Sequence, residues 1–117
     1  MTALRVSFYL KKRNLCVRLS GYLDQETVKD LRTKLIEIID TNNVLNIVFN
    51  MKEVEFMDST GVGVIIGRYN QIKFKGGKIV ICEMNKNIER IIFLTGLARI
   101  CSLKENEASA INYLECV

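Results

Sequence analysis

The chain has 117 residues, of which 49% are hydrophobic and 26% are charged, and its formal net charge is +4. These values are typical of one globular domain over residues 1–117. No stretch approaches the roughly 20 apolar residues that a membrane span needs, and the absence of histidine counts against hydrolytic and metal chemistry.

The cysteines indicate a reducing compartment. Cys16, Cys82, Cys101 and Cys116 form no C-x-x-C pair, and the first three lie in apolar, strand-like runs. We interpret those three as small core residues. The first five residues do not resemble a signal peptide, so we expect a cytoplasmic protein with no metal and no cofactor.

Positive charge is concentrated in two short segments, at 11–13 (Lys-Lys-Arg) and 73–78 (Lys-Phe-Lys-Gly-Gly-Lys). A nucleic-acid site would need a basic stripe interleaved with aromatic residues, and neither segment provides one. We interpret both as solvated turns and expect no nucleic-acid partner. Because no stretch could span a membrane, we expect no membrane partner either.

The first part of the chain predicts a β-hairpin followed by a helix. Hydrophobic residues alternate over 4–10 and again over 15–21, with a polar turn at 11–14. Asp24 is a good N-cap for a helix, which the turn-forming residues 40–43 end. The apolar stripe of that helix is Val28, Leu31, Leu35, Ile38 and Ile39.

The rest of the chain alternates strands with helices. Residues 44–50 and 78–82 are nearly continuous apolar runs, typical of interior strands, and 100–103 predicts an edge strand. Between them we expect a loop up to Ser59, a helix from about Thr60 to Phe74, and a helix around 88–94 that Gly96 closes. A last helix is expected over 105–115. The three predicted stripes are Val62, Ile65, Ile66, Tyr69 and Ile72; then Ile88, Ile91, Ile92 and Leu94; then Ala108, Ile111 and Leu114.

The resulting order is ββαβαβαβα. It predicts a single α/β domain with a mixed, mostly parallel sheet, an N-terminal β-hairpin and about four helices.

The most informative stretch is 56–63, Phe-Met-Asp-Ser-Thr-Gly-Val-Gly, at the start of the second predicted helix. One interpretation makes Asp58 or Ser59 a plain N-cap. However, Gly61, Gly63 and Gly67 each cost a helix about 0.5–1 kcal/mol relative to alanine, so something must require a bare backbone there. The stretch also follows a buried strand, where α/β sheets place their sites.

Two chemical alternatives stay open from the residues alone. Gly61, Gly63 and Gly67 form G-x-G-x-x-x-G, which is one residue longer than a dinucleotide-binding fingerprint, and would make the chain a small nucleotide-binding protein. Alternatively, Ser59 could be a nucleophile, although without histidine only a lysine or a carboxylate could act as its base.

Residues 58–63, Asp-Ser-Thr-Gly-Val-Gly, resemble the D-S-[ST]-G-[LV]-G motif of STAS domains, the bacterial anti-sigma-factor antagonists. Residues 21–24, Gly-Tyr-Leu-Asp, resemble the G-x-L-D that opens the first helix of these domains. The likeness runs nearly end to end and includes 15–19 and 95–97.

The resemblance implies a regulator rather than an enzyme. In this family the serine after the aspartate, here Ser59, is phosphorylated by a partner that is both anti-sigma factor and kinase. The unphosphorylated antagonist captures that kinase and frees a sigma factor, here one of sporulation, and a serine phosphatase resets it. Partner contacts are then expected at Asp24, Asp58, Thr60, Gly61 and Gly63, and Thr60 stays open as a minor phosphate acceptor.

Overall fold

The computed structural model describes residues 3–116 and is built on one five-stranded sheet in the order β1-β2-β3-β4-β5. β1 pairs with β2 antiparallel, and the remaining neighbours pair parallel, which confirms the expected hairpin and mostly parallel sheet. The strands are β1 (Arg5–Lys11), β2 (Asn14–Leu23), β3 (Asn46–Met57), β4 (Ile79–Cys82) and β5 (Cys101–Lys104).

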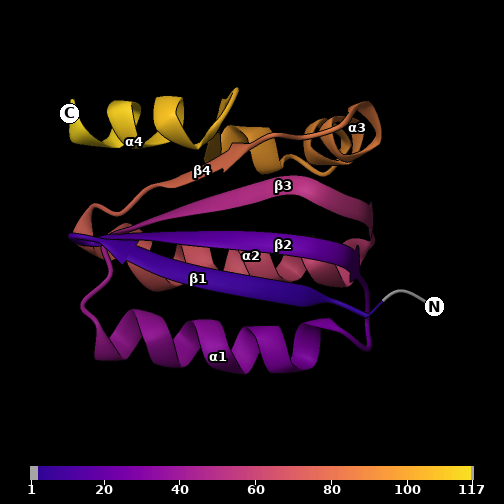
Figure 1. The fold of residues 1–117 in the computed structure, drawn as a ribbon, viewed down its shortest axis with the longest axis horizontal. Helices are drawn as coiled ribbons and strands as arrows, with labels where there is room; N and C mark the ends of the chain where they lie inside the picture. The colour runs from indigo at the N-terminus through magenta and orange to yellow at the C-terminus, as the bar shows by residue number, and fades with distance from the viewer. Residues whose placement is uncertain (1–2, 117) are drawn as a thin grey trace.

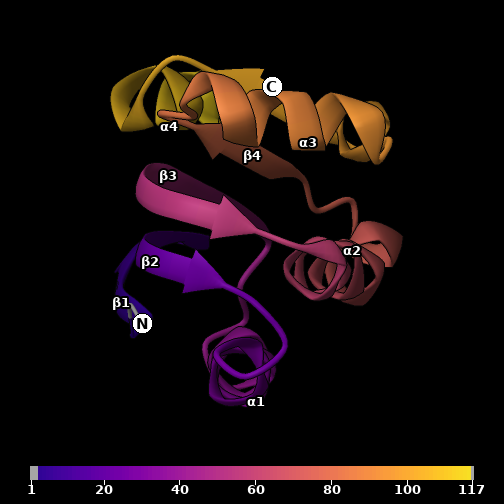
Figure 2. The same ribbon diagram turned by 90° about the vertical axis from the view of Figure 1, so that its right-hand side faces the viewer.

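Helices cover both faces of this sheet (Figures 1 and 2). They are α1 (Val28–Thr41), α2 (Ser59–Ile72), α3 (Lys86–Leu94) and α4 (Glu107–Glu115), with 3-10 turns η1 (Lys73–Lys75) and η2 (Leu97–Arg99). The main core includes buried residues of α1, α2 and α3, whereas a smaller core lies under α4.

The two cores explain why the central strands are apolar at consecutive positions. In β3, Ile47 and Phe49 belong to the main core and Val48 between them belongs to the core under α4. Successive side chains of a strand point to opposite faces, so a strand that is covered twice has no polar face. Cys16 and Cys82 lie in the small core and Cys101 in the main one, as expected. Burial raises the pKa of Cys82 and of Cys101 to about 12.

The predicted loop between residue 50 and Ser59 is wrong, because β3 continues to Met57. β2 also runs on, through Leu23, and Leu23 pairs with Met57 after two irregularities in the register. Met51, Val54 and Met57 are buried along this extension. Their spacing of three hides the two-residue periodicity that identifies a strand in sequence.

Three residues of the predicted apolar stripes face outward instead. Leu94 is 78% exposed, Ile66 is 38% exposed and Ala108 is also exposed. In α2, Val64 is buried and Ile66 is not, because the buried face of a helix depends on the neighbouring elements as well as on the spacing of apolar residues. None of the described helices is both long enough and apolar enough to cross a lipid bilayer.

Candidate functional site

The site lies at the carboxyl edge of the sheet, between the end of β3 at Met57 and the start of α2 at Ser59. Asp58 is the only residue between the two elements, and its extended backbone makes it the N-cap of α2. The first N–H groups of a helix have no partner inside the helix, so this position needs an acceptor.

The Asp58 carboxylate supplies that acceptor. Its Oδ1 accepts hydrogen bonds from the backbone N–H of Thr60 at 2.9 Å, from that of Gly61 at 3.3 Å, and from the Thr60 hydroxyl. Burial by itself would raise the pKa of Asp58, but the hydrogen bonds together outweigh it and lower the pKa below its ordinary value. Asp58 therefore binds the local backbone, and within residues 3–116 no hydrogen bond joins it to the Ser59 hydroxyl.

Consequently the two adjacent hydroxyls differ. The Thr60 hydroxyl is held by Asp58, and Thr60 is half-buried. Ser59 is exposed, and its hydroxyl has no hydrogen bond within residues 3–116. Ser59 therefore offers a free oxygen to solvent at the start of a helix.

Asp24 lies in the neighbouring turn, but it does not cap α1. Its Oδ1 accepts from the backbone N–H groups of Glu26 and Thr27, both at 3.1 Å, and α1 begins only at Val28. The prediction of a direct helix cap is wrong because Asp24 closes a turn that precedes the helix. Thr27 stands at the N-cap, but its hydroxyl accepts from Asp24 N–H and donates to the Tyr22 carbonyl rather than accepting from the first N–H groups of α1.

The Asp24 turn and the Asp58 cap are joined through the backbone. Asp58 N–H donates to the carbonyl of Leu23 at 3.1 Å, and the backbone N–H of Gln25 helps to lower the pKa of Asp58. The structure thus brings Asp24 close to Asp58 and Ser59, although 34 residues separate Asp24 from Asp58 in the chain.

The glycines divide into two kinds. Gly61 is buried, and a Cβ there would lie 2.7 Å from Met57 Cγ and 3.0 Å from Leu23 Cβ. Packing inside the domain therefore requires the bare backbone of Gly61. Gly63 is exposed and Gly67 is half-buried, and a Cβ at either would have no neighbour within 4 Å.

Exposed apolar residues that the sequence did not reveal lie on α2 and at the end of α3. Phe93 and Leu94, at the end of α3, are 59% and 78% exposed. A depression of about 340 Å³ joins α2 to η2 and is lined in part by Ile66, Tyr69 and Leu97. Residues 91–94 are four consecutive large apolar residues, which cannot all lie on one face of an amphipathic helix, and this was the available indication.

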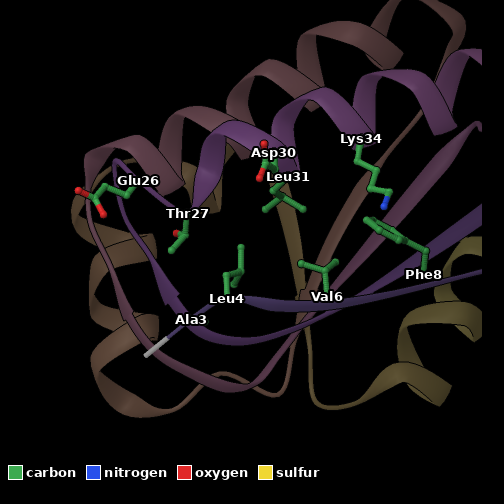
Figure 3. A pocket seen from close by; sticks show the side chains of 9 residues that line it. All are labelled: Ala3, Leu4, Val6, Phe8, Glu26, Thr27, Asp30, Leu31 and Lys34. Carbon is green, nitrogen blue, oxygen red and sulfur yellow. The ribbon is translucent and has the colours of Figure 1, made fainter. Parts of the chain in front are cut away.

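A second depression, between β1 and α1, does not favour nucleotide binding (Figure 3). It measures about 350 Å³, its apolar lining includes Val6, Phe8 and Leu31, and its rim carries Glu26 and Asp30. None of the three glycines lines it, and its two carboxylates outnumber its one cation, Lys34, so its net charge does not favour phosphates. Within residues 3–116 no group of three or more His, Cys, Asp or Glu side chains could hold a metal ion.

Comparison with known proteins places this geometry in context. The sequence-family model of the STAS domain matches residues 5–110 of this chain. An anti-sigma F factor antagonist from Paenibacillus polymyxa is 41% identical over 103 residues, covering 88% of each chain. An anti-sigma-B factor antagonist from Bacillus subtilis is 29% identical over 92 residues, covering 79% of this chain and 83% of that one.

Among solved structures, the unphosphorylated form of the anti-sigma factor antagonist SpoIIAA has a TM-score of 0.78 at 22% identity, covering 98% of this chain and 100% of that one. The phosphorylated form of the Bacillus cell fate determinant SpoIIAA has a TM-score of 0.74 at 25% identity, covering 96% and 99%.

Proposed function

Because this chain belongs to the STAS-domain family, we propose that it is an anti-sigma-factor antagonist, a protein-binding module that is switched by phosphorylation. In its unphosphorylated form it binds an anti-sigma factor that is also a serine kinase, and thereby releases a sporulation sigma factor. Phosphorylation of Ser59 ends this binding, and a serine phosphatase restores it. The chain acts by binding rather than as an enzyme.

The observation that carries the proposal is the free, exposed Ser59 hydroxyl beside a Thr60 hydroxyl that is already engaged by Asp58. A kinase can phosphorylate Ser59 without breaking the cap of α2, whereas transfer of a phosphate to Thr60 requires that the Thr60 hydroxyl first leave Asp58. This difference supports Ser59 as the acceptor.

The partner surface extends from this edge along the outer face of α2. Ser59, Gly63, Ile66 and Asn70 are its exposed residues, at spacings of three and four. The exposed Phe93 of α3 extends it with apolar area of the kind enriched at interface centres. Gly63 allows the partner's backbone to approach closely, since no side chain stands in the way.

The expected contact residues have different parts in this surface. Asp24 lies beside the acceptor and contacts the partner directly, while Asp58 and Thr60 fix the start of α2. Gly61 contributes from inside, because its missing side chain allows α2 to pack against Leu23 and Met57.

Phosphorylation changes binding through charge. A phosphate adds about −1.5 to −2 charges at Ser59. The start of α2 favours that charge by roughly 0.3–1 kcal/mol, while the Asp58 and Asp24 carboxylates nearby oppose it, so the fold changes little. The partner's site must already hold the phosphates of ATP, so a phosphate on Ser59 meets like charge there and the complex dissociates.

The test uses the anti-sigma F factor that the Paenibacillus polymyxa relative antagonises. The chain is incubated with that protein and ATP, and intact-mass and peptide mass spectrometry locate the phosphate. We expect one phosphate, on Ser59, and none on Ser59→Ala. Phosphate on Thr60 of the parent chain would refute Ser59 as the acceptor. Stoichiometric binding of ATP by the isolated chain would favour a nucleotide-binding protein over a module that binds only proteins.

A further inference from the structure

The two basic segments that the sequence places 60 residues apart meet at one end of the molecule. Lys11 ends β1, Lys12 and Arg13 form its turn to β2, and residues 73–78 connect α2 to β4. Both turns lie at the amino edge of the parallel strands, the end opposite to the start of α2 (Figure 1). We call residues 11–13 and 73–78 together the basic end.

A buried pair of asparagines fixes the two turns side by side. The Arg13 carbonyl accepts from the N–H groups of Leu45 and Asn46, at 2.8 and 3.2 Å. Asn46 Oδ1 accepts from Lys78 N–H at 2.9 Å, and Asn46 Nδ2 donates to Asn14 Oδ1 at 3.0 Å. Asn14 and Asn46 are both buried, so the relative position of the two turns belongs to the folded core.

The cations of the basic end are not neutralised by ion pairs. The Arg13 guanidinium donates to the backbone and side-chain oxygens of Asn43, which are uncharged. The ammonium groups of Lys73 and Lys78 lie over the rings of Tyr69 and Tyr113. No ion pair within residues 3–116 includes a residue of the basic end. Asp40 and Glu115 lie near the last residues of α1 and α4. These two acids are fewer than the six cations of the basic end, so positive charge stays in excess there.

An exposed aromatic ring lies between two of these lysines. Phe74, in η1, is 81% exposed and is flanked by Lys73 and Lys75. Its turn is well anchored: Gly77 N–H donates to the Ile72 carbonyl at 3.0 Å, and Gly77 is packed against Ile72. A rigid turn thus presents a large apolar side chain to water.

We propose that the basic end docks on the surface of a membrane that contains anionic lipids. A group of four to eight Lys and Arg residues is attracted to such a surface, and the basic end has six. Phe74 projects from the same end, so in the docked chain its side chain inserts into the boundary between headgroups and acyl chains. A nucleic-acid site would instead need several rings to stack successive bases, whereas the basic end has one largely exposed ring, Phe74.

This docking revises the expectation that the chain has no membrane partner, which rested on the absence of a spanning segment. It is a surface contact and needs no span. Because Ser59 lies at the opposite end of the molecule, a docked chain still presents Ser59 to a protein partner.

The first experiment is sedimentation with large unilamellar vesicles. We expect the chain to bind vesicles of phosphatidylglycerol and phosphatidylcholine in equal parts, not to bind phosphatidylcholine alone, and to lose affinity as salt increases. The chain has no tryptophan, so Phe74→Trp gives a single fluorescent reporter at the proposed contact. Its emission should shift to the blue with anionic vesicles only, and an unchanged emission would overturn insertion at this residue.

A pair of charge-matched variants separates the basic end from the net charge. Lys73→Glu with Lys75→Glu should weaken vesicle binding at least tenfold. Lys29→Glu with Lys86→Glu makes the same charge change at exposed positions in the first turns of α1 and α3, and should weaken it less than threefold. Circular dichroism checks that both fold. Equal losses of vesicle affinity in the two double variants would overturn the proposal. Tighter binding of the parent chain to a DNA duplex than to anionic vesicles at the same salt would also overturn it.

Discussion

The Asp58 carboxylate accepts hydrogen bonds from both the backbone N–H and the hydroxyl of Thr60, and this pairing closes the start of α2. It gives each of three consecutive residues its own state: Asp58 is the cap, Ser59 is free and exposed, and Thr60 is held. The cap can therefore be perturbed separately from the proposed phosphate acceptor.

The cap should be sensitive to pH. The pKa of Asp58 is lower in the folded chain than in the unfolded chain, so its contribution is complete at neutral pH and is lost as the pH falls through the folded-state pKa. At pH 7, Asp58→Ala should lower the free energy of unfolding by about 0.5–2 kcal/mol. Urea unfolding of both proteins at pH 7 and pH 3 should show a smaller difference at pH 3.

Asp58→Asn is the matched control, since asparagine caps a helix about as well as aspartate. It should retain most of the stability at pH 7. If the difference between the parent and Asp58→Ala were the same at both pH values, the carboxylate charge would have no part in the cap.

The proposed switch predicts that charge at Ser59 weakens partner binding without unfolding the chain. Ser59→Asp should bind the anti-sigma factor at least tenfold more weakly, equivalent to about 1.4 kcal/mol, and Ser59→Ala should bind like the parent. Calorimetric titration measures both, and thermal unfolding should place both within about 0.5 kcal/mol of the parent. Asn112→Asp, exposed on α4, adds the same charge and should leave binding unchanged. Parent-like affinity of Ser59→Asp would rule out the charge mechanism.

Gly61→Ala and Gly63→Ala should have opposite effects. At Gly61 the new methyl group would collide with Met57 and would lie 3.1 Å from the Leu23 carbonyl oxygen, so we expect a loss of about 1–3 kcal/mol in the free energy of unfolding. At Gly63 there is open space in a helix interior, so stability should be unchanged or rise by up to about 1 kcal/mol.

Partner binding completes this comparison. Gly63→Ala should weaken it, because the proposed contact requires close approach to the helix backbone. Gly63→Ala with both stability and affinity unchanged would remove Gly63 from the partner surface.

The buried Arg68 should lower the free energy of unfolding relative to an apolar side chain of similar size. It is only 5% exposed, its Nε donates to Gln71 Oε1 at 3.0 Å, and its Nη1 has no hydrogen-bond partner within residues 3–116. Burial and the nearby Arg32 lower its pKa. Arg68→Met should keep the packing volume, remove the unsatisfied donor and raise the free energy of unfolding by about 1 kcal/mol in urea titrations.

Arg90→Met, at an exposed position of α3, changes the net charge equally and should stay within about 0.5 kcal/mol of the parent. A loss of more than about 1 kcal/mol in Arg68→Met would indicate that the guanidinium contributes favourable contacts.

The sequence by itself determined the order of the elements and where the candidate site residues lie in the chain. Helix periodicity, the turn residues and the glycine after α3 depend on neighbours within a few positions, so they can be read locally. The acid, the two hydroxyls and the glycines of 58–63 were identifiable for the same reason, because helix capping involves residues only two or three apart.

Only the tertiary structure decided which of these residues face inward and which meet. Gly61 and Gly63 look alike in sequence, but Leu23 and Met57 surround only the first. Leu94 fits the helical stripe and yet is exposed, since burial depends on what packs against a position. The two basic turns lie near each other because parallel pairing brings the amino ends of β2, β3 and β4 to one edge, where Asn46 bonds to Asn14 on one side and to Lys78 on the other.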